Sequence, residues 1–376
     1  MEQYIKAATE QFEKLLREQL AREERMAAGS GAVDFSAKEK IRIGVVGGDG
    51  IGPIIVAQAK RVMEKLLADE IASGRIELVQ IDGLTIENRM ACGKSLPDDV
   101  LAAIKSCDVL LKGPTTTPKG GTMESANVSL RRELDLFANV RPVQIPEEGI
   151  DWTFYRENTE GEYVLGSRGV ELPGKLAMDF KVTTLHGTER IARAAMDFAR
   201  KNGKNRVEIV TKANIMKKTD GNFSEIANRI AREEYPELET EDWYIDIMTA
   251  NLVNPELRNK FQVFLLPNLY GDIITDEAAQ IQGGVGTAGS ANIGDKYAMF
   301  EAIHGSAPRM IEAGEGDYAN PESIFKALEM LLRHISLGEK ADKLSAAFTA
   351  PGAPVVTGHK DGASCSEFAD YIIGKL

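Results

Sequence analysis

Short apolar segments alternate with amphipathic segments along most of this chain, and this alternation limits the fold more than any other feature. The apolar segments are rich in Val, Ile and Leu and have the length of buried strands. The amphipathic segments repeat apolar residues at helical spacing. We predict strands at 41–46, 76–81, 108–113, 137–143, 207–212, 244–250 and 261–267, and helices at 54–70, 97–106, 188–202, 221–235, 321–335 and 367–375. Strands and helices in alternation indicate an α/β fold built around a sheet.

Residues 2–27 form a predicted amphipathic helix that precedes this pattern. Ile5, Phe12, Leu16 and Leu20 recur at helical spacing among Glu, Lys, Arg and Gln. The glycines and small polar residues that follow are typical of a linker. A single amphipathic helix is rarely stable alone in water, so we expect it to dock on its own domain or on a partner subunit.

Charge and composition exclude several classes of function. With 376 residues, 43% of them hydrophobic and 27% charged, the chain has room for two domains with a sizeable core. The net charge of −12 argues against nucleic acid or a membrane surface as a partner. No apolar run approaches the roughly 18 residues of a membrane span. The cysteines lack metal-ligand spacing, so we expect reduced thiols and a cytoplasmic protein.

The first predicted strand is followed by the glycine-rich turn GDGIGP at 48–53. This turn resembles the dinucleotide-binding pattern G-x-G-x-x-G, but Pro53 stands where the third glycine belongs. It therefore predicts a tight strand-to-helix connection, with Pro53 suited to the first helical position. It does not indicate a standard Rossmann site.

The segment at 112–143 carries the strongest signal for a ligand. It places Ser125, Asn127, Arg131 and Arg141 within seventeen residues, in an apolar framework. Guanidinium groups bind carboxylates in a bidentate manner, and a hydroxyl and an amide can bond a further carboxylate oxygen. One such arginine alone would be an ordinary surface residue. The four groups together predict a small polyacid as the ligand.

Two aspartates in NLYGDIITDEAAQ indicate a metal. Asp272 and Asp276 are four residues apart, so on a helix their carboxylates share one face. Asp246 ends a further predicted strand, in YIDIMTA. Oxygen ligands without a nearby histidine or cysteine select Mg²⁺ or Mn²⁺ over zinc. An Asp pair of this kind is more often the solvated start of a helix, but together with a polyacid site it favours a divalent ion.

Four further side chains are candidates for the chemistry. Lys212 directly follows a buried strand and could act as a base or proton relay, although a lysine that reaches solvent from a strand end is the simpler interpretation. RENTEGEY contains Arg156, a third arginine, and Tyr163, which could deliver a proton or be a core tyrosine. His304 opens a turn of small residues where the backbone could approach a cofactor.

Five blocks, in this order, resemble those of one family, the metal-dependent β-decarboxylating dehydrogenases. The blocks are GDGIGP, KGPTTTP through LDLFANVRPV, RENTEGEY, NLYGDIITDEAA, and EAIHGSAP followed by Asn320. The family comprises isocitrate, isopropylmalate, homoisocitrate and tartrate dehydrogenases, and the resemblance covers residues 41–376. It implies an isocitrate/isopropylmalate dehydrogenase-like α/β fold, with two α/β domains that share a central sheet system, which is not a standard Rossmann fold.

The resemblance also implies a division of the chain and an assembly. The expected parts are an N-terminal helix and linker at 1–37, a large cofactor-binding domain at 38–136 and 284–376, and a small domain with a dimer-forming segment at 137–283. The expected assembly is a homodimer with active sites shared between subunits, or a higher oligomer built from it.

Carried over to this sequence, the family pattern implies a role for each candidate residue. Tyr163 and Lys212 would handle protons, with the lysine reaching across the dimer interface. Mg²⁺ or Mn²⁺ would be held by Asp272 and Asp276, with Asp246 supplied by the other subunit. The substrate carboxylates would be bound by Ser125, Asn127, Arg131, Arg141 and Arg156. The nicotinamide dinucleotide would be bound by Thr116, His304, Gly305, Ser306, Ala307, Pro308, Arg309, Met310 and Asn320.

Within the family, the pair Ser125 and Asn127 is similar to the Ser-x-Asn of isocitrate dehydrogenases. Isopropylmalate enzymes have apolar residues here, and polar groups facing an isopropyl group would be left unpaired at about 1–3 kcal/mol each. We therefore expect isocitrate as the substrate, with isopropylmalate, homoisocitrate and tartrate as alternatives. A non-catalytic regulatory subunit is an alternative of another class, but such subunits are expected to have lost part of the catalytic set.

The cofactor is less well defined by the sequence. Family members that use NADP commonly have a Lys-Tyr pair after the HGTAP-type turn, and members that use NAD commonly have Asp followed by an aliphatic residue. Here Arg309 and Met310 match neither pattern. Arg309 could pair with a 2′-phosphate, whereas Met310 and the lack of a C-terminal Tyr and Arg favour NAD. We expect NAD, with NADP as the alternative.

Overall fold

The computed structural model describes residues 2–29, 31–118, 123–166, 168–284 and 288–376. The chain divides into two compact units: unit 1 is Met1–Gly31 with Phe137–Ala278, and unit 2 is Ala32–Leu136 with Ala279–Leu376. Residues 119–122 of the segment that predicts a polyacid ligand lie outside the described residues. Among the described residues, no helix combines the length and apolar composition needed to cross a membrane.

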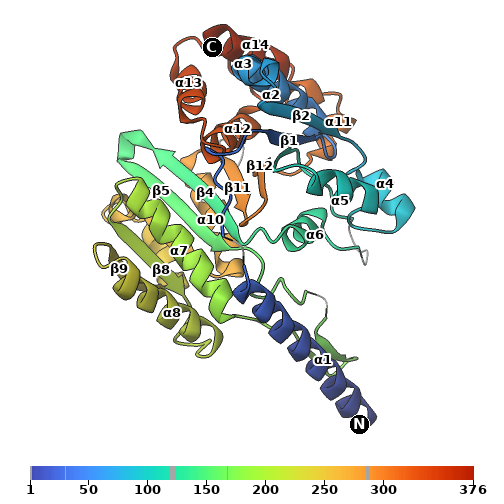
Figure 1. Ribbon diagram of the computed structural model, residues 1–376, viewed down its shortest axis with the longest axis vertical. Coiled ribbons are helices and arrows are strands. Elements are labelled where there is room, and N and C mark those ends of the chain that lie inside the picture. The colour runs from blue at the N-terminus through green and yellow to red at the C-terminus, as the bar shows by residue number, and fades with distance from the viewer. Residues whose placement is uncertain (1, 30, 119–122, 167, 285–287) are drawn as a thin grey trace. The chain divides into compact units, whose positions relative to one another are not determined.

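Unit 2 contains a mixed sheet with the strand order β2-β1-β3-β12-β11 (Figure 1). Strands β2, β1, β3 and β12 run parallel to one another, and β11 is antiparallel to β12. On one side β3 therefore pairs with β12, which lies far along the chain. The antiparallel β11 also distinguishes this sheet from the all-parallel sheet of a Rossmann fold. The bounds are β1 Ile41–Val46, β2 Ile76–Ile81, β3 Val109–Lys112, β11 Gly289–Ile293 and β12 Ala298–Ala302.

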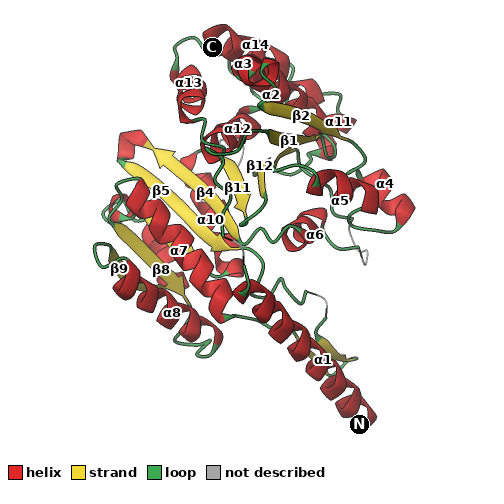
Figure 2. Ribbon diagram, viewed as in Figure 1, coloured by secondary structure: helices red, strands yellow, loops and turns green. Residues whose placement is uncertain are grey.

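Helices cover both faces of this sheet (Figure 2). Leu110 of β3 packs with Val100 and Leu130 in one apolar cluster, while α2 and α12 pack against the strands as well. Neighbouring residues of a strand face opposite sides of the sheet. Because helices cover both sides, every residue of β3 should be buried, and every one is. The bounds are α2 Gly52–Leu66, α3 Ala68–Ala72, α4 Ile86–Cys92, α5 Asp98–Lys105, α6 Ala126–Glu133, α11 Pro308–Glu312, α12 Glu322–His334, α13 Gly338–Thr349 and α14 Cys365–Lys375.

Unit 1 contains a sheet with the strand order β4-β5-β10-β8-β9, of which only the β4–β5 pairing is antiparallel. Helices α7 and α8 cover one face (Figure 1). Inside the unit the rings of Phe154 and Phe264 stack at 4.4 Å. The bounds are β4 Ala138–Ile145, β5 Ile150–Glu157, α7 Leu185–Lys201, β8 Arg206–Thr211, α8 Thr219–Glu234, β9 Glu239–Tyr244, α9 Ile245–Leu252, β10 Val263–Leu266 and α10 Asn268–Gln282.

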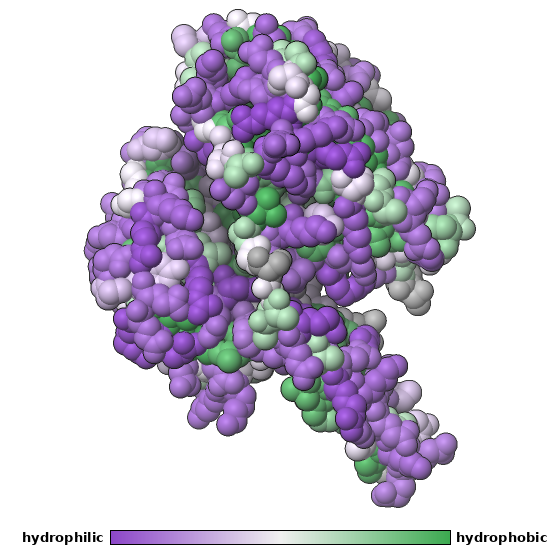
Figure 3. Space-filling model, in the orientation of Figure 1, coloured by the Kyte–Doolittle hydropathy of each residue, from purple (hydrophilic) through white to green (hydrophobic). Residues whose placement is uncertain are grey.

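The N-terminal helix α1, Glu2–Ala27, packs against α7 and against a small hairpin, β6 Val170–Leu172 with β7 Leu176–Met178. Leu15 is its one buried residue among those described, and the Phe12 ring lies 5.6 Å from that of Phe180. Figure 3 shows hydrophobic side chains at the surface of this helix. Ile5, Leu16 and Leu20 are all exposed. The helix therefore docks on unit 1 and keeps part of its apolar face exposed.

Two predicted elements differ from the structure. The strand predicted at 244–250 is wrong: β9 ends at Tyr244 and α9 begins at Ile245. The true strand is charged and exposed because, among the described strands, β9 pairs with β8 alone and lies at the edge of the sheet. In α9, Met248 and Leu252 are buried at helical spacing. The helix predicted at 54–70 is instead divided at Leu67 into α2 and α3.

Candidate active site

Arg156 lies at the C-terminal end of β5 and is fully buried, so its charge must be paired. Its Nε donates to the Asn268 carbonyl oxygen at 2.9 Å and its Nη2 to Asn268 Oδ1 at 2.6 Å. Its Nη1 donates to Asp272 Oδ1 at 2.6 Å. A Cβ at Gly271 would lie 2.5 Å from Arg156 Cγ, so α10 approaches β5 this closely because residue 271 is glycine.

Tyr163 shares the carboxylate of Asp272 with Arg156. Its hydroxyl donates to Asp272 Oδ2 at 2.8 Å. The guanidinium carbon of Arg156 lies 5.3 Å from the centroid of the Tyr163 ring. One carboxylate thus holds both an arginine and a tyrosine that the sequence analysis assigned to the site.

Arg141 of β4 forms a second ion pair with α10. Its Nη1 donates to Thr275 Oγ1 at 2.7 Å and to Asp276 Oδ1 at 2.7 Å. Thr275 is itself held by the Gly271 carbonyl oxygen at 2.7 Å. Asp272 and Asp276 therefore lie one turn apart on α10 and face two arginines from two neighbouring strands.

The two aspartates fit a hard divalent cation as part of its ligand set. Their side chains are 42% and 64% exposed, so both carboxylates are accessible despite their ion pairs. Carboxylate oxygens are the ligands that Mg²⁺ and Mn²⁺ prefer. Among the described residues, no three His, Cys, Asp or Glu side chains form a metal-binding group. One chain thus offers Asp272 and Asp276, and the remaining ligands would have to come from elsewhere.

Lys212 and Asp246 form a separate pair in unit 1. Lys212 Nζ donates to Asp246 Oδ1 at 2.5 Å, and this hydrogen bond lowers the pKa of Asp246. The Lys212 backbone N–H donates to the buried carboxylate of Asp220 at 2.8 Å, and Lys181 pairs with the same carboxylate at 2.6 Å. The backbone of Lys212 is therefore fixed, while Asp246 is 61% exposed at the surface of unit 1.

Three predicted substrate residues lie on or next to α6 in unit 2. Ser125 is the N-cap residue of α6, but its side chain makes no capping hydrogen bond. Asn127 accepts a hydrogen bond from the Thr115 hydroxyl at 3.1 Å through its Oδ1. Ser125 and Asn127 precede Arg131 by six and four residues, which is between about one and two helical turns, and both are partly exposed.

Arg131 is directed toward a buried carboxylate of unit 2. Its Nη2 lies 3.7 Å from Glu301 Oε1. Lys112 Nζ is 3.1 Å from Glu301 Oε2, and Asn292 Nδ2 donates to Oε1 at 2.8 Å. Burial acts to raise the pKa of Glu301, but the charges of Lys112 and Arg131 outweigh burial and hold it below its usual value. Glu301 is therefore an anion that orients both cations.

The glycine-rich turn and the loop around Ser306 contact each other closely in unit 2. A Cβ at Gly50 would lie 2.0 Å from the Ser306 carbonyl oxygen, and the Ile51 N–H donates to that oxygen at 3.0 Å. Thr116 joins them: its hydroxyl is 2.7 Å from that of Ser306, and its N–H donates to Asp49 at 2.7 Å. The turn therefore holds two of the predicted cofactor residues in place.

The remaining cofactor candidates follow Ser306 or lie just beyond it. Gly305 is exposed, Ala307 has a left-handed backbone with φ of 44°, and Pro308 begins α11, which carries Arg309 and Met310. Asn320 Oδ1 accepts the Glu322 N–H at 2.9 Å. Burial lowers the pKa of His304, and its buried Nε2 has no hydrogen-bond partner among the described residues. A buried ring nitrogen without such a partner fits a ligand that donates a hydrogen bond to it.

Three further residues hold these groups in place, although none of them was a candidate from the sequence. Asn268 fixes Arg156, Asp49 fixes Thr116, and Glu301 orients Arg131. Asn268 directly follows an apolar predicted strand, in FLLPN. A polar residue in such a position must find a partner, and this signal could have identified it. Glu301 offered no such signal, because AMFEA is not recognised as a strand from its sequence.

Three comparisons agree on one family. The family model described as isocitrate/isopropylmalate dehydrogenase matches residues 42–370. The chain is 40% identical over 304 residues to an isocitrate dehydrogenase (NADP) of Rickettsia bellii (strain RML369-C), covering 78% of this chain and 59% of that protein. It is 36% identical over 348 residues to the probable isocitrate dehydrogenase (NAD) subunit alpha, mitochondrial, of Drosophila melanogaster, covering 89% of this chain and 87% of that protein.

A solved structure gives the same result for the fold. The crystal structure of isocitrate dehydrogenase from Methylococcus capsulatus is 34% identical, with a TM-score of 0.78 over 89% of this chain and 99% of that chain. The chain belongs to the isocitrate/isopropylmalate dehydrogenase family, and the expected fold class is confirmed. It spans only 59% of the length of the rickettsial relative.

Proposed function

We propose that this chain catalyses the oxidative decarboxylation of isocitrate to 2-oxoglutarate and carbon dioxide, with reduction of a nicotinamide dinucleotide and dependence on Mg²⁺ or Mn²⁺. The observation that carries this proposal is the carboxylate of Asp272, which accepts hydrogen bonds from both Arg156 and Tyr163. This arrangement supports a polycarboxylate ligand, a cation and a proton donor at one place on α10.

The bound groups would supply the chemistry that side chains lack. Asp272 and Asp276 would hold a cation, which would stabilise negative charge on the substrate oxygen. Thr116, the turn at 304–310 and Asn320 would hold the nicotinamide dinucleotide, which would take up the hydride. We assign Arg141 and Arg156 to the substrate carboxylates, because buried, oriented guanidinium groups bind carboxylates strongly. We also assign to the substrate carboxylates three residues on or next to α6, namely Ser125, Asn127 and Arg131.

Two residues of the chain would move protons. We assign to Lys212 the removal of the proton from the substrate hydroxyl. This proton must leave the oxygen as the hydride leaves the carbon that carries the hydroxyl. The resulting ketone lies β to a carboxylate, so carbon dioxide departs and a carbanion equivalent remains on the substrate. Tyr163 would deliver its hydroxyl proton to that carbon, and its hydrogen bond to Asp272 orients the hydroxyl for this step.

The exposed position of Lys212 and Asp246 supports an active site completed by a second subunit. Apolar side chains surround the pair: Ile215 is 67% exposed, Tyr244 41% and Ile247 45%. Such side chains rarely face water together on a monomer. We therefore propose a homodimer in which Lys212 and Asp246 of one subunit serve the site of the other.

Substrate and cofactor choice are proposals of the same kind. The uncapped hydroxyl of Ser125 and the amide of Asn127 support isocitrate over isopropylmalate, because both polar groups need polar partners. Homoisocitrate and tartrate are retained as alternatives. We propose NAD as the cofactor, with NADP as the alternative that Arg309 would favour.

The test measures absorbance of the reduced nicotinamide on the purified protein with Mn²⁺. Isocitrate and 3-isopropylmalate are each combined with NAD and with NADP, with and without a chelator. We expect turnover confined to isocitrate, faster with NAD, and lost when the metal is chelated. Turnover of isopropylmalate would contradict the assignment of Ser125 and Asn127. No turnover, with homoisocitrate and tartrate also inactive, would favour the regulatory subunit.

A further inference from the structure

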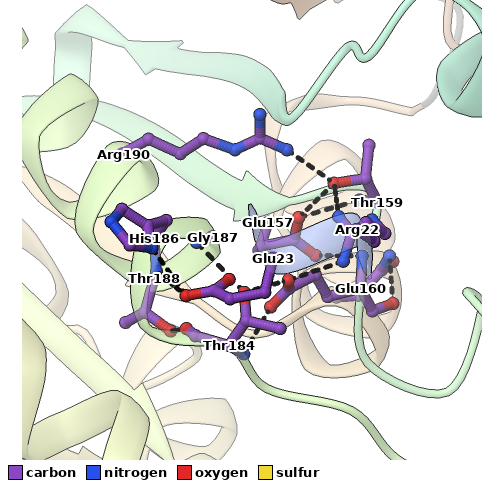
Figure 4. A network of polar contacts seen from close by, with 11 residues as sticks. Arg22, Glu23, Glu157, Thr159, Glu160, Thr184, His186, Gly187, Thr188 and Arg190 are labelled. Atoms are coloured by element: carbon purple, nitrogen blue, oxygen red, sulfur yellow. Dashed lines mark hydrogen bonds and ion pairs between the residues drawn. The ribbon is translucent and has the colours of Figure 1, made fainter. Parts of the chain in front are cut away.

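The N-terminal helix, which lies outside the region that matches the family model, contacts the segment that leads to Tyr163. Arg22 Nη1 donates to Glu160 Oε1 at 2.7 Å, and its Nη2 donates to the Thr159 hydroxyl at 3.1 Å (Figure 4). The side chain of Arg22 is 16% exposed and that of Glu160 is 3% exposed. Glu157 is also buried, so Arg22 brings a positive charge to a place with two buried carboxyl groups.

The same helix makes a second polar contact nearby. Glu23 Oε1 accepts the His186 N–H at 3.1 Å and lies 2.6 Å from His186 Nδ1. Glu160 in turn accepts the Thr184 N–H at 3.0 Å and the Thr184 hydroxyl at 2.5 Å. Figure 4 shows both contacts at the N-terminal end of α7. Arg22 and Glu23 thus connect α1 to a helix end and to the chain that follows β5.

Glu160 is linked to the candidate catalytic residues through its backbone. Its carbonyl oxygen accepts Asn268 Nδ2 at 3.1 Å. Asn268 Oδ1 accepts both the Nε and the Nη2 of Arg156. Tyr163 follows Glu160 by three residues and bonds Asp272, which also accepts from Arg156. A shift of Glu160 would therefore reach both Arg156 and Tyr163.

We propose that Arg22 is a positioning residue for the reaction, and that α1 is a strap that holds residues 157–163 in the geometry in which Tyr163 delivers its proton. Arg22 touches neither substrate nor cofactor and acts through Glu160. This inference rests on the proposed function of Tyr163. It gives the N-terminal helix a role in catalysis in addition to any role in assembly.

Charge explains why the arginine is needed. Two buried carboxyl groups close in sequence repel each other when both are ionised, and an unpaired buried charge is strongly unfavourable. Without Arg22, Glu160 would lose its guanidinium partner while Glu157 stays beside it. The segment would then rearrange to reach water, and the Asn268 contact with the Glu160 carbonyl oxygen would be strained or lost.

The first test is steady-state oxidation of isocitrate by the full-length chain and its variants. For Arg22→Gln we expect kcat to fall by about 10- to 100-fold, since small displacements of a catalytic group have effects of this size. The KM for isocitrate should change less than kcat, because Arg156 lies in β5 and keeps its ion pair with Asp272 when its contact with Asn268 is weakened. Arg22→Lys, which keeps the charge, should retain more activity. Arg17→Gln is the matched control, as Arg17 is exposed on the same helix and pairs only with Glu13 among the described residues.

A double variant separates charge from general stability. Arg22→Gln with Glu160→Gln removes both charges, so we expect it to recover part of the kcat that Arg22→Gln loses. An unchanged kcat in Arg22→Gln, or an equal loss in Arg17→Gln, would overturn the proposal.

The second test does not depend on activity. Hydrogen–deuterium exchange of the full-length chain should be faster in residues 157–163 of Arg22→Gln than of the wild type, and unchanged there in Arg17→Gln. An equal increase throughout unit 1 would overturn the positioning role, because it would mean general destabilisation. If the wild type does not oxidise isocitrate, the proposed function fails, and the exchange result alone decides whether α1 holds this segment.

Discussion

Each buried arginine of the candidate site is paired with a carboxylate that is itself partly exposed. Arg156 is fully buried and Asp272 is 42% exposed, and Arg141 is 10% exposed where Asp276 is 64% exposed. The positive charge is thus held at a fixed place, and the negative charge faces solvent. Under the proposed function, the fixed guanidinium groups would bind the polyacid, and the exposed carboxylates would bind the cation.

At the scale of single residues, Tyr163→Phe should separate binding from chemistry. The substitution removes the hydroxyl that bonds Asp272 and keeps the ring beside Arg156. We expect kcat for isocitrate to fall by about 10² to 10⁴, the usual contribution of a positioned acid, with little change in KM. Tyr4→Phe on the exposed face of α1 is the control. An unchanged kcat with a raised KM would refute the proton-donor role.

A second prediction concerns the buried carboxyl of Glu157. Burial and the neighbouring charge of Glu160 raise its pKa from 4.5 to about 7. The folded chain therefore binds this proton more tightly than the unfolded chain does. The stabilisation is complete below pH 4.5 and is lost as the pH rises through about 7.

The free energy of unfolding should thus fall between these pH values, by at most about 1.4 kcal/mol per pH unit for one group. Urea titrations at several pH values measure it. In Glu157→Gln the fall should be smaller than in the wild type, whereas in Glu256→Gln, at an exposed position, it should persist. Equal slopes in wild type and Glu157→Gln would contradict the raised pKa.

At the scale of elements, the contact between α10 and β5 depends on one glycine. Gly271→Ala would place a Cβ 2.5 Å from Arg156 Cγ and 2.6 Å from its Cβ, so α10 must move away from β5. We expect lower stability and a loss of isocitrate turnover, because Asp272 follows directly. Thermal unfolding and steady-state kinetics measure the two effects.

The matched control is the same substitution in another helix of unit 1. A Cβ at Gly221 in α8 meets nothing within 4 Å. Gly221→Ala should therefore be neutral or stabilise the protein by up to about 1 kcal/mol. Similar effects of the two substitutions would show that the α10–β5 approach has no special role.

The sequence predicted strands rich in Val, Ile and Leu better than strands that contain small, polar or charged residues. β1, β3 and β10 are mostly apolar because they are buried within the two units, and β1 and β3 contain one charged residue each. The edge strand β9 is charged and was assigned to the wrong residues. β11 and β12 were not predicted, since GSANI and AMFEA contain small and polar residues whose partners lie elsewhere in the chain.

The candidate site shows the same limit. Motifs within one segment, such as Asp272 and Asp276, could be read from their spacing. The pairs that hold the site could not: Arg22 and Glu160 are 138 positions apart, and Arg141 and Asp276 are 135 apart. The sequence around each of these residues does not indicate its partner, because the contact forms only after the strands and helices have packed.

At the scale of the whole molecule, the proposed sharing of active sites can be tested with two inactive variants. Lys212→Met should inactivate the site of the other subunit, and Tyr163→Phe its own site. A dimer that combines one subunit of each kind would contain one intact site. After random exchange of equal amounts, we expect about a quarter of wild-type activity.

The measurement is isocitrate turnover after coexpression or subunit exchange, with each variant alone as control. Light scattering should give the mass of a dimer, and Ile247→Glu should reduce that mass, whereas the exposed Val355→Glu should not. A mixture no more active than its two components, in a sample shown to contain mixed dimers, would mean that each subunit builds its own site.

The strand order of unit 2 also sets an order of events during synthesis. β3 has β1 on one side and β12 on the other, and β12 is made only after the whole of Phe137–Ala278. While the ribosome makes that stretch, one edge of β3 has no partner, and unpaired strand edges promote aggregation. Residues 137–278 can meanwhile fold with α1, whose sequence is complete first. In the nascent chain, β1, β2 and β3 therefore remain without β11 and β12 until residues beyond 278 have been made. Chaperone binding should concentrate on the unpaired edge of β3.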